Sequence, residues 1–248
     1  MGPQSVTGNA RPAFYALAPG GWRDYVTLLH PPYTLWHLSY VAIGASLAPH
    51  FRPWILGLAL VSFFLGMGVA AHALDELHGR PLATRISRRT LVALAAVSLI
   101  AAAAIGVGVA IRTTLWLLPF IAVGVFIAIA YNLELFGGRF HGDPWFALAW
   151  GAFPVVATYV ASAETIRVEA VLAATFAALL SHAQRRLSTP VRLVRRRTTG
   201  VTGRIELVDG TSLTITRETL TEEAERALRA LAACVVALAV ALVLLRVT

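Results

Sequence analysis

The chain has few charged residues, a single cysteine and no lysine. Only 14% of its 248 residues are charged, whereas a soluble domain carries about a quarter, so an ordinary soluble domain is excluded. The one cysteine, Cys234, allows neither a disulfide framework nor a thiolate metal site and is expected to be a small core residue. All 21 basic residues are arginine, which is typical of GC-rich prokaryotic genomes. The N-terminus lacks a charged-then-apolar leader, so no cleaved signal peptide is expected.

The chain is instead rich in long apolar segments. Hydrophobic residues make up 57% of it, and the mean hydropathy is +0.69. Stretches of roughly 17–25 apolar residues, long enough to span a bilayer as helices, recur along the sequence. They predict an all-α, polytopic membrane bundle of about seven spans, in contact with membrane lipids, at residues 34–50, 53–74, 90–111, 114–131, 145–163, 166–183 and 226–246.

The arginines predict the orientation of the bundle. They concentrate in the loops at 75–89, 132–143 and 184–225, and the alternate loops carry few. The positive-inside rule then places the N-terminus and these three loops in the cytoplasm and the C-terminus outside. We expect a multi-pass protein of the prokaryotic cytoplasmic membrane. Nucleic acid is not an expected partner, because no basic fold interleaved with aromatics is present.

One local pattern occurs twice, each time at the end of an apolar segment. A histidine is followed three and four residues later by two charged residues, and these positions share one face of a helix. Internal repetition in a membrane protein is typical of a central cavity between two halves. We therefore expect the two histidine faces to meet, with roughly 10 Å between Cα atoms as in packed helices. The copies are His72, Asp75 and Glu76, and His182, Arg185 and Arg186.

Four stretches between residues 28 and 190 match the motifs of one family in order and spacing. They are His30-Pro31-Pro32-Tyr33, Ala71-His72-Ala73-Leu74-Asp75 with Arg80-Pro81-Leu82, Tyr131-Asn132 with Gly151-Ala152-Phe153-Pro154, and Ser181-His182-Ala183-Gln184-Arg185. Together they resemble the UbiA superfamily of intramembrane aromatic prenyltransferases. The resemblance implies a cavity open to the cytoplasmic side that holds an isoprenoid or other lipophilic substrate.

The chain departs from that family in its acidic motifs. His72, His182 and Arg185 stand where the family has aspartates, and seven spans replace the usual nine. Carboxylates hold the Mg²⁺ that neutralises a prenyl diphosphate. The resemblance therefore implies metal ligands at Asp75, Glu76 and Asp143, catalytic roles for Asp75, His72, His182 and Tyr131, and substrate contacts from Arg80, Arg185, Arg186 and His37.

Several of these residues have a second interpretation. Imidazoles at His72 and His182 favour a transition metal over Mg²⁺. Asp75 and Glu76 are also expected to form a structural clasp with Arg185 and Arg186, because buried charges need partners. The remaining alternatives are an N-cap role for Asp143 before Pro144, simple packing for His37, and an interfacial position for Tyr131.

Three functions stay open at this point. The leading one is a UbiA-like enzyme that transfers or processes an isoprenoid. The second is a diverged, non-catalytic binding or assembly protein with the same fold. The third is a membrane protein that binds or transports a metal through His72 and His182.

The segment before the last span lies outside the family pattern. A basic run at 192–197 indicates contact with anionic lipids. Alternating residues on both sides of Asp209-Gly210 predict a small cytoplasmic β-hairpin. The hairpin side chains Ile205, Leu207, Leu213 and Ile215 are expected to pack on the bundle mouth or a partner. Thr219 with Glu222 predicts a capping box at the start of the final helix.

The sequence divides into five expected units. They are an interfacial segment at 1–33, the first four-helix repeat at 34–131, the start of a second repeat at 132–190, the basic loop with the hairpin at 191–225, and the last span at 226–248.

Overall fold

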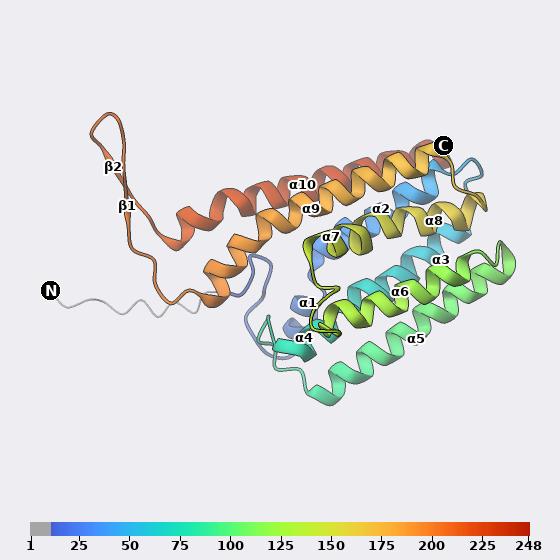
Figure 1. The fold of residues 1–248 in the computed structure, drawn as a ribbon, viewed down its shortest axis with the longest axis horizontal. Coiled ribbons are helices and arrows are strands. Elements are labelled where there is room, and N and C mark those ends of the chain that lie inside the picture. The colour runs from blue at the N-terminus through green and yellow to red at the C-terminus, as the bar shows by residue number, and fades with distance from the viewer. Residues whose placement is uncertain (1–10) are drawn as a thin grey trace.

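A computed structural model describes residues 11–248 and shows a bundle of long, nearly parallel and antiparallel helices (Figure 1). Its elements are α1 (Trp22–Leu28), α2 (Pro31–Leu47), α3 (Pro53–Phe63), η1 (Phe64–Ala71), α4 (His72–Gly79), α5 (Arg88–Arg112), α6 (Leu117–Asn132), α7 (Asp143–Phe146), η2 (Ala147–Ala152), α8 (Phe153–Ala163), α9 (Val168–Arg197), β1 (Arg204–Glu206), β2 (Ser212–Thr214) and α10 (Arg217–Val247). The η segments are π-helical, and they join their neighbours into two continuous rods, Pro53–Gly79 and Asp143–Ala163.

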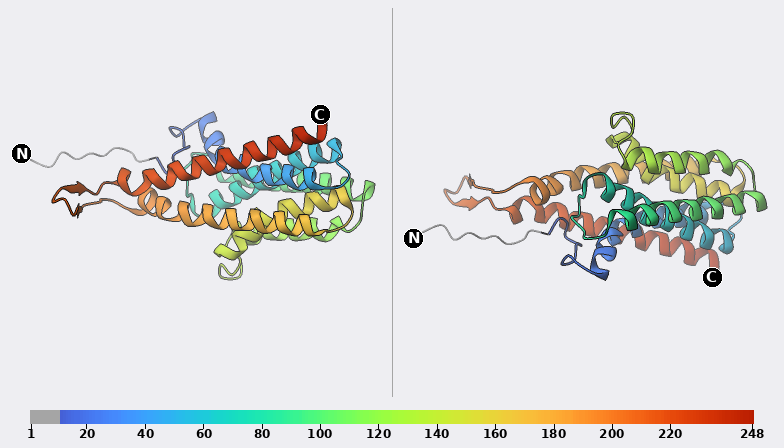
Figure 2. Two further views of the ribbon diagram at one scale, coloured as in Figure 1. Left: turned by 90° about the horizontal axis from the view of Figure 1, so that it is seen from above. Right: turned by 90° about the horizontal axis from the view of Figure 1, so that it is seen from below.

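The helices form three rows, which Figures 1 and 2 show from different sides. α9 and α10 pack together along one face, and α10 also packs against α2. α2 contacts α8 in the middle of the bundle, and α3, α5 and α6 complete the opposite side. α2 and α8 are consequently the most enclosed elements.

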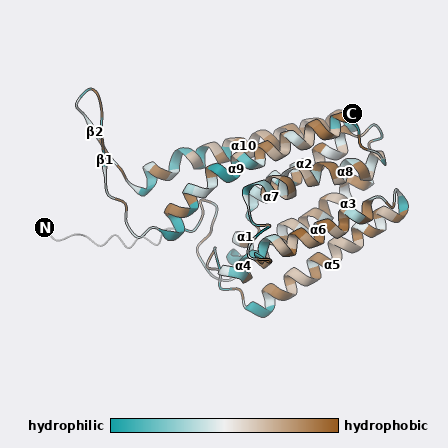
Figure 3. Ribbon diagram, viewed as in Figure 1, coloured by the Kyte–Doolittle hydropathy of each residue, from teal (hydrophilic) through white to brown (hydrophobic). Residues whose placement is uncertain are grey.

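Within residues 11–248, four helices are long and apolar enough to cross a membrane: Pro53–Gly79, Arg88–Arg112, Asp143–Ala163 and Arg217–Val247. Leu117–Asn132 is apolar but shorter. The other two expected spans, 34–50 and 166–183, lie largely within α2 and α9. Hydrophobic residues predominate along the helices (Figure 3), and large apolar side chains such as Ile100, Ile111 and Leu172 are exposed. Such a surface indicates a membrane protein and is compatible with contact between its helices and lipid.

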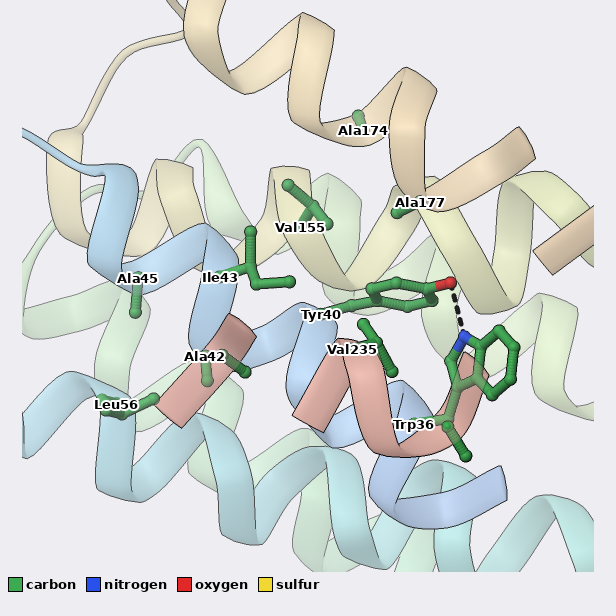
Figure 4. Packing of buried hydrophobic residues seen from close by; sticks show 12 residues of the cluster. Trp36, Tyr40, Ala42, Ile43, Ala45, Leu56, Val155, Ala174, Ala177 and Val235 are labelled. Atoms are coloured by element: carbon green, nitrogen blue, oxygen red, sulfur yellow. Dashed lines mark hydrogen bonds between the residues drawn. The ribbon is translucent and has the colours of Figure 1, made fainter. Parts of the chain in front are cut away.

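Aromatic and small residues fill the contact between α2, α8, α9 and α10 (Figure 4). Trp36 and Tyr40 are fully buried, and the Trp36 indole N–H donates to the Tyr40 hydroxyl at 2.5 Å. Two glycines let backbones approach closely, as is common between membrane helices. A Cβ at Gly44 would lie 2.3 Å from the carbonyl oxygen of Val155, and one at Gly151 would lie 2.5 Å from that of Ala177.

Two local expectations for the last helix are wrong. α10 begins one residue after Thr216, whose side chain accepts from the Thr219 N–H, so the capping box joins these two threonines and not Thr219 with Glu222. Glu222 instead pairs with Arg226 on the exposed surface. Cys234 is exposed on the same helix, because the apolar outside of a membrane bundle takes the residue types that a soluble core would bury.

The β-hairpin is confirmed, but it does not pack on the bundle. β1 and β2 pair antiparallel with Ile205 opposite Leu213, and Gly210 takes a φ of 81° in the turn. Every residue of both strands is exposed, and the hairpin projects beyond the helices (Figures 1 and 2). The expected packing of Ile205, Leu207 and Leu213 on the bundle mouth is therefore wrong. Their packing on a partner stays a prediction.

The three arginine-bearing loops lie at one end of the bundle, as the charge pattern predicts (Figure 1). Residues 11–30 lie at this same end, where Arg196 Nε donates to the Pro12 carbonyl at 3.1 Å. The C-terminus lies at the other end, where Arg246 donates to the Ala48 carbonyl. We call the loop-bearing end the mouth. That the mouth is cytoplasmic remains a prediction.

Candidate functional site

Three arginines form a stripe on one face of α9 at the mouth. Arg185, Arg192 and Arg196 are seven and four residues apart, so they share one side of the helix. All three are partly buried. In the described chain the polar contacts of Arg192 and Arg196 are neutral, to Thr189 Oγ1 at 3.0 Å and to the Pro12 carbonyl, and neither has a carboxylate partner. Burial, and then the charges of Arg185 and Arg196, lower the pKa of Arg192.

Asp75 faces this stripe from α4. Arg196, His141 and Arg192 lie within electrostatic reach of its carboxylate. The side chain is half-buried, and within residues 11–248 it makes no hydrogen bond or ion pair. Asp75 is therefore available to a ligand or a proton, and it only partly offsets the positive charge opposite.

Arg185, on α9, holds that helix to the loop that follows α6. Its Nε donates to Asp143 Oδ1 at 2.5 Å, its Nη1 donates to the Tyr131 hydroxyl, and its Nη2 donates to the His141 carbonyl at 3.2 Å. The guanidinium also lies 5.9 Å from the ring centre of Tyr131. Arg185 is consequently held in place by protein groups. Asp143 does not cap its helix: Gly142 occupies the N-cap position, and the Asp143 carboxylate turns to Arg185.

The two repeated histidines do not form a pair. His72 stacks on His30, with ring centres 4.0 Å apart and planes 13° apart, and its Nδ1 hydrogen-bonds to the Gly68 carbonyl at 3.0 Å. His182 is exposed, on the Asp143 side of α9. His72 thus has a different partner from the expected one, because the chain before α2 supplies His30, and His182 stays exposed. His72 and His30 cannot share one ion, since the lone pairs of stacked rings lie in separate, nearly parallel planes. A transition metal at His72 and His182 stays a prediction.

Glu76 has a structural role. Its carboxylate is fully buried and accepts from the Leu82 N–H at 3.0 Å and from the N–H and hydroxyl of Thr84 at 2.8 and 2.9 Å. Arg80 closes the same loop, since its Nη1 donates to the carbonyls of Thr84 and Ile86 at 3.0 and 2.7 Å. The expected clasp of Glu76 with Arg186 is therefore wrong. The side chain of Arg186 is 73% exposed, 4.0 Å from Asp143 Oδ2.

His37 fits the packing interpretation. It is buried in α2, and its Nδ1 hydrogen-bonds to the Trp150 carbonyl at 2.9 Å. That carbonyl belongs to the π-helical segment η2, where backbone groups are freed from the ordinary helical pattern. The bond ties α2 to the rod beside it.

An apolar groove adjoins the mouth. It lies between α3 with η1, α5, α6, and η2 with α8. Along α6 it extends from Leu117 to Ala128, about 17 Å at 1.5 Å per residue. At the mouth end, Ile127 and Trp150 pack against Tyr131, whose hydroxyl meets Arg185. Tyr131 thus stands between the apolar groove and the arginines.

Two of the three acids expected to bind Mg²⁺ are engaged by protein groups. Glu76 is saturated by three donors, and Asp143 is bound by Arg185. Of the three acids, Asp75 alone makes no hydrogen bond or ion pair within residues 11–248. A magnesium site uses one or two carboxylates with substrate phosphates, so Mg²⁺ at Asp75 stays a prediction. As the structure stands, no group of three or more His, Cys, Asp or Glu side chains in the described chain is arranged to hold an ion. The mouth is organised by guanidinium groups.

The sequence did not reveal the positions at the mouth of Arg192, Arg196 and the buried acid Asp24. Arg192 and Arg196 belong to a run that indicates lipid contact, and only their spacing from Arg185 shows that they turn inward. Asp24 is buried, and it accepts from the Gly20 and Arg85 N–H groups, each at 2.9 Å. It holds the segment before α2 against the mouth, and no local pattern marks it.

Comparison of the chain with family models, with curated proteins and with solved structures finds no match. What the protein does must therefore be argued from the mouth, the groove and the residues between them.

Proposed function

We propose that the chain is a diverged, UbiA-like membrane protein of seven spans that binds a lipophilic molecule, such as an isoprenoid, by a phosphate- or diphosphate-bearing head. One observation carries this proposal. Arg192 and Arg196 are partly buried beside Arg185, and in the described chain they have no carboxylate partner. Charges removed from water without a counter-ion are costly, and an anionic head would supply that counter-ion.

The chemistry of the arginines suits such a head. Guanidinium groups present planar, paired donors that match phosphate oxygens, and they remain charged at any physiological pH. They neutralise the anion without a metal, which agrees with the loss of Mg²⁺ ligands.

The groove suits the chain of the same molecule. Its lining is apolar and aromatic, with only Ser62 and Thr158 as polar members. Its mouth end lies next to Tyr131, which also contacts Arg185. A lipid with its head at the arginines therefore has an apolar path for its tail past Tyr131.

Transfer of the isoprenoid to an aromatic acceptor, which would form a C–C bond, lose a ring proton and release diphosphate, is a second candidate, favoured by the position of Tyr131. An aromatic face next to the groove would stabilise a developing allylic cation, while Arg185 and its neighbours hold the departing anion. The engagement of Glu76 and Asp143 in structural contacts favours binding without turnover. We rank binding first for that reason.

The test uses purified full-length protein in nanodiscs, with farnesyl diphosphate as probe and farnesol as its uncharged match. Changing Arg192 and Arg196 together to Gln should weaken diphosphate binding by at least about tenfold, which is 1.4 kcal/mol, and leave farnesol binding unchanged. Arg197→Gln, on the exposed side of the same helix, is the control. Equal diphosphate affinity in all three proteins contradicts the proposal.

Pyrophosphate release in the same samples, with an aromatic acceptor added, separates the two candidates. Binding without release supports the binding protein. Release that Tyr131→Leu abolishes, while binding persists, supports transfer.

A further inference from the structure

The outer edge of the β-hairpin is complementary in charge to a second copy of itself. Within residues 11–248 the sheet consists of β1 and β2 alone, and every residue of both strands is exposed. β1 is Arg204-Ile205-Glu206, a cation, an apolar residue and an anion in that order. We propose that β1 pairs antiparallel with β1 of a second copy of this chain, so that two hairpins form one four-stranded sheet. This pairing does not depend on the proposed function.

The hydrogen bonds of the hairpin show which backbone groups of β1 face outward. The Leu207 N–H donates to the Thr211 carbonyl at 2.8 Å. In an antiparallel ladder alternate residues bond to the same neighbour, so Ile205, two residues earlier, also bonds to β2. The N–H and C=O groups of Arg204 and Glu206 therefore point to the outer edge, where no strand of the described chain pairs with them. Such an edge is a template for a strand of another chain.

One register of two β1 strands satisfies both the charges and the hydrogen bonds. With Ile205 opposite Ile205 of the second copy, each Arg204 lies opposite a Glu206, and opposite charges stabilise such a pair. These residues have the outward backbone groups, so each pair exchanges its N–H···O=C bonds. A shift of two residues in either direction sets Arg204 against Arg204 or Glu206 against Glu206, which is destabilising. The sequence of β1 thus selects its own register.

Both charged side chains are available to the second copy. Arg204 Nη2 lies 3.4 Å from Glu206 Oε1 of its own strand, and the two side chains are 65% and 68% exposed. Arg204 Nη2 also donates to Ser212 Oγ at 2.8 Å, again on the exposed surface. Exposed ion pairs of this kind contribute little to stability. Exchange of the partner within the strand for one across the interface therefore costs little.

Pairing of the two hairpins also extends their apolar face. Ile205 lies opposite Leu213, and both side chains are exposed. In the four-stranded sheet these two residues and their counterparts in the second copy form one row across all strands. A lone hairpin is marginally stable in water, whereas three or more strands with an apolar face support one another. The second copy supplies the strands that the single hairpin lacks.

Insertion in one membrane favours the antiparallel arrangement. The strands run across the direction of the helices, beyond the end of the bundle (Figure 1). Two copies in one membrane have the same orientation, so a two-fold axis between them runs along the helices. Rotation about that axis reverses a strand that lies across it. Equivalent strands of the two copies therefore meet antiparallel.

Cysteine cross-linking of the full-length protein in isolated membranes tests the pairing. The single native thiol is removed by Cys234→Ser, and Ile205→Cys is added. The central residues of the proposed interface form a non-hydrogen-bonded pair with Cα atoms about 4.5 Å apart, within the range of about 4.4–6.8 Å that a disulfide needs. Oxidation with copper phenanthroline should convert most of this protein to a covalent dimer.

Two other cysteine positions are the matched controls. Leu213→Cys should give no dimer, because three strand spacings of about 4.8 Å separate the two copies of this residue in the sheet. Val208→Cys, fully exposed in the turn, reports random collision and should react much more slowly than Ile205→Cys. A Leu213→Cys dimer, equal rates at Val208 and Ile205, or a product with the mass of a different partner overturns the proposal.

Charge reversal is a second measurement on the Ile205→Cys protein. Arg204→Glu sets like charges opposite each other and should slow dimer formation about threefold or more. Addition of Glu206→Arg places opposite charges in exchanged positions and should restore the rate. Thermal unfolding should be the same in all variants, because the hairpin is exposed. A rate of dimer formation that Arg204→Glu does not change, or that the double exchange does not restore, overturns the proposal.

Discussion

Arg185 and Asp143 lie 42 residues apart in the sequence, and the Arg185 guanidinium donates to the Asp143 carboxylate at 2.5 Å. The same guanidinium contacts Tyr131 and the His141 carbonyl. One side chain of α9 thus ties down the end of α6, the following loop and the start of α7. This contact replaces the expected clasp, because the acid that binds Arg185 is Asp143 and not Asp75 or Glu76.

Arg185→Ala should destabilise the bundle. It removes three hydrogen bonds and leaves Asp143 without its cation, at a cost of about 2–3 kcal/mol, or a fall in Tm of roughly 4–12 °C at this chain length. Thermal unfolding in detergent measures it. Arg186→Ala, which removes a largely exposed side chain, should stay within about 0.5 kcal/mol. Equal losses in the two variants would contradict the structure.

Glu76→Ala should be more damaging than Asp75→Asn. Alanine leaves the N–H groups of Leu82 and Thr84 and the Thr84 hydroxyl without their acceptor, at about 1–3 kcal/mol for each buried group. The loop at 80–86 should become sensitive to protease. Asp75→Asn should fold normally, because Asp75 makes no hydrogen bond in the described chain. An Asp75→Asn protein less stable than Glu76→Ala would contradict this assignment.

Gly44→Ala should disrupt the contact between α2 and α8. The added methyl would meet the Val155 carbonyl at 2.3 Å, and overpacking of this kind costs about 1–3 kcal/mol. Gly57→Ala is the matched control in α3, where an added Cβ meets nothing within 4 Å. It should be neutral or stabilise by about 0.5–1 kcal/mol. A lower Tm for Gly57→Ala than for Gly44→Ala would show that the two glycines have been given the wrong roles.

Acid should destabilise the mouth through His30. Burial lowers the pKa of His30 well below its usual value of about 6.5, and its buried Nε2 has no hydrogen-bond partner in the described chain. The folded state then binds fewer protons than the unfolded state below about pH 6.5, so stability is present above that pH and is lost as the pH falls toward the folded pKa. The groups that face His30 are His72, His37, Tyr15, Arg192 and Arg196.

Tm measured from pH 7.5 to pH 5 tests this. His30→Gln should flatten the decline, because it removes the group that must be protonated, whereas His50→Gln, at an exposed position in the loop after α2, should leave the decline unchanged. An unaltered slope in His30→Gln would rule His30 out as its source.

The amino-acid sequence by itself determined the membrane character, the helical class, the hairpin and the placement of three loops at one end. Each depends on properties of neighbouring residues: apolar runs long enough to span a bilayer, alternation around Asp209-Gly210, and the density of arginine in short loops. These features survive any arrangement of the helices. The outward position of Cys234 was missed because apolar residues face lipid as readily as they face a core.

Tertiary structure alone decided which charges meet. Asp75, Glu76 and Asp143 are equivalent as carboxylates. Within residues 11–248, however, Asp75 has no polar partner, Glu76 is buried in its own loop and Asp143 is bound to Arg185. Those outcomes depend on the loop at 80–86 folding back on α4, on α7 approaching α9, and on residues before α2 placing His30 against His72. Electrostatic and hydrogen-bonding partners are chosen by distance in space, to a few tenths of an ångström, and local sequence does not encode separations of that size.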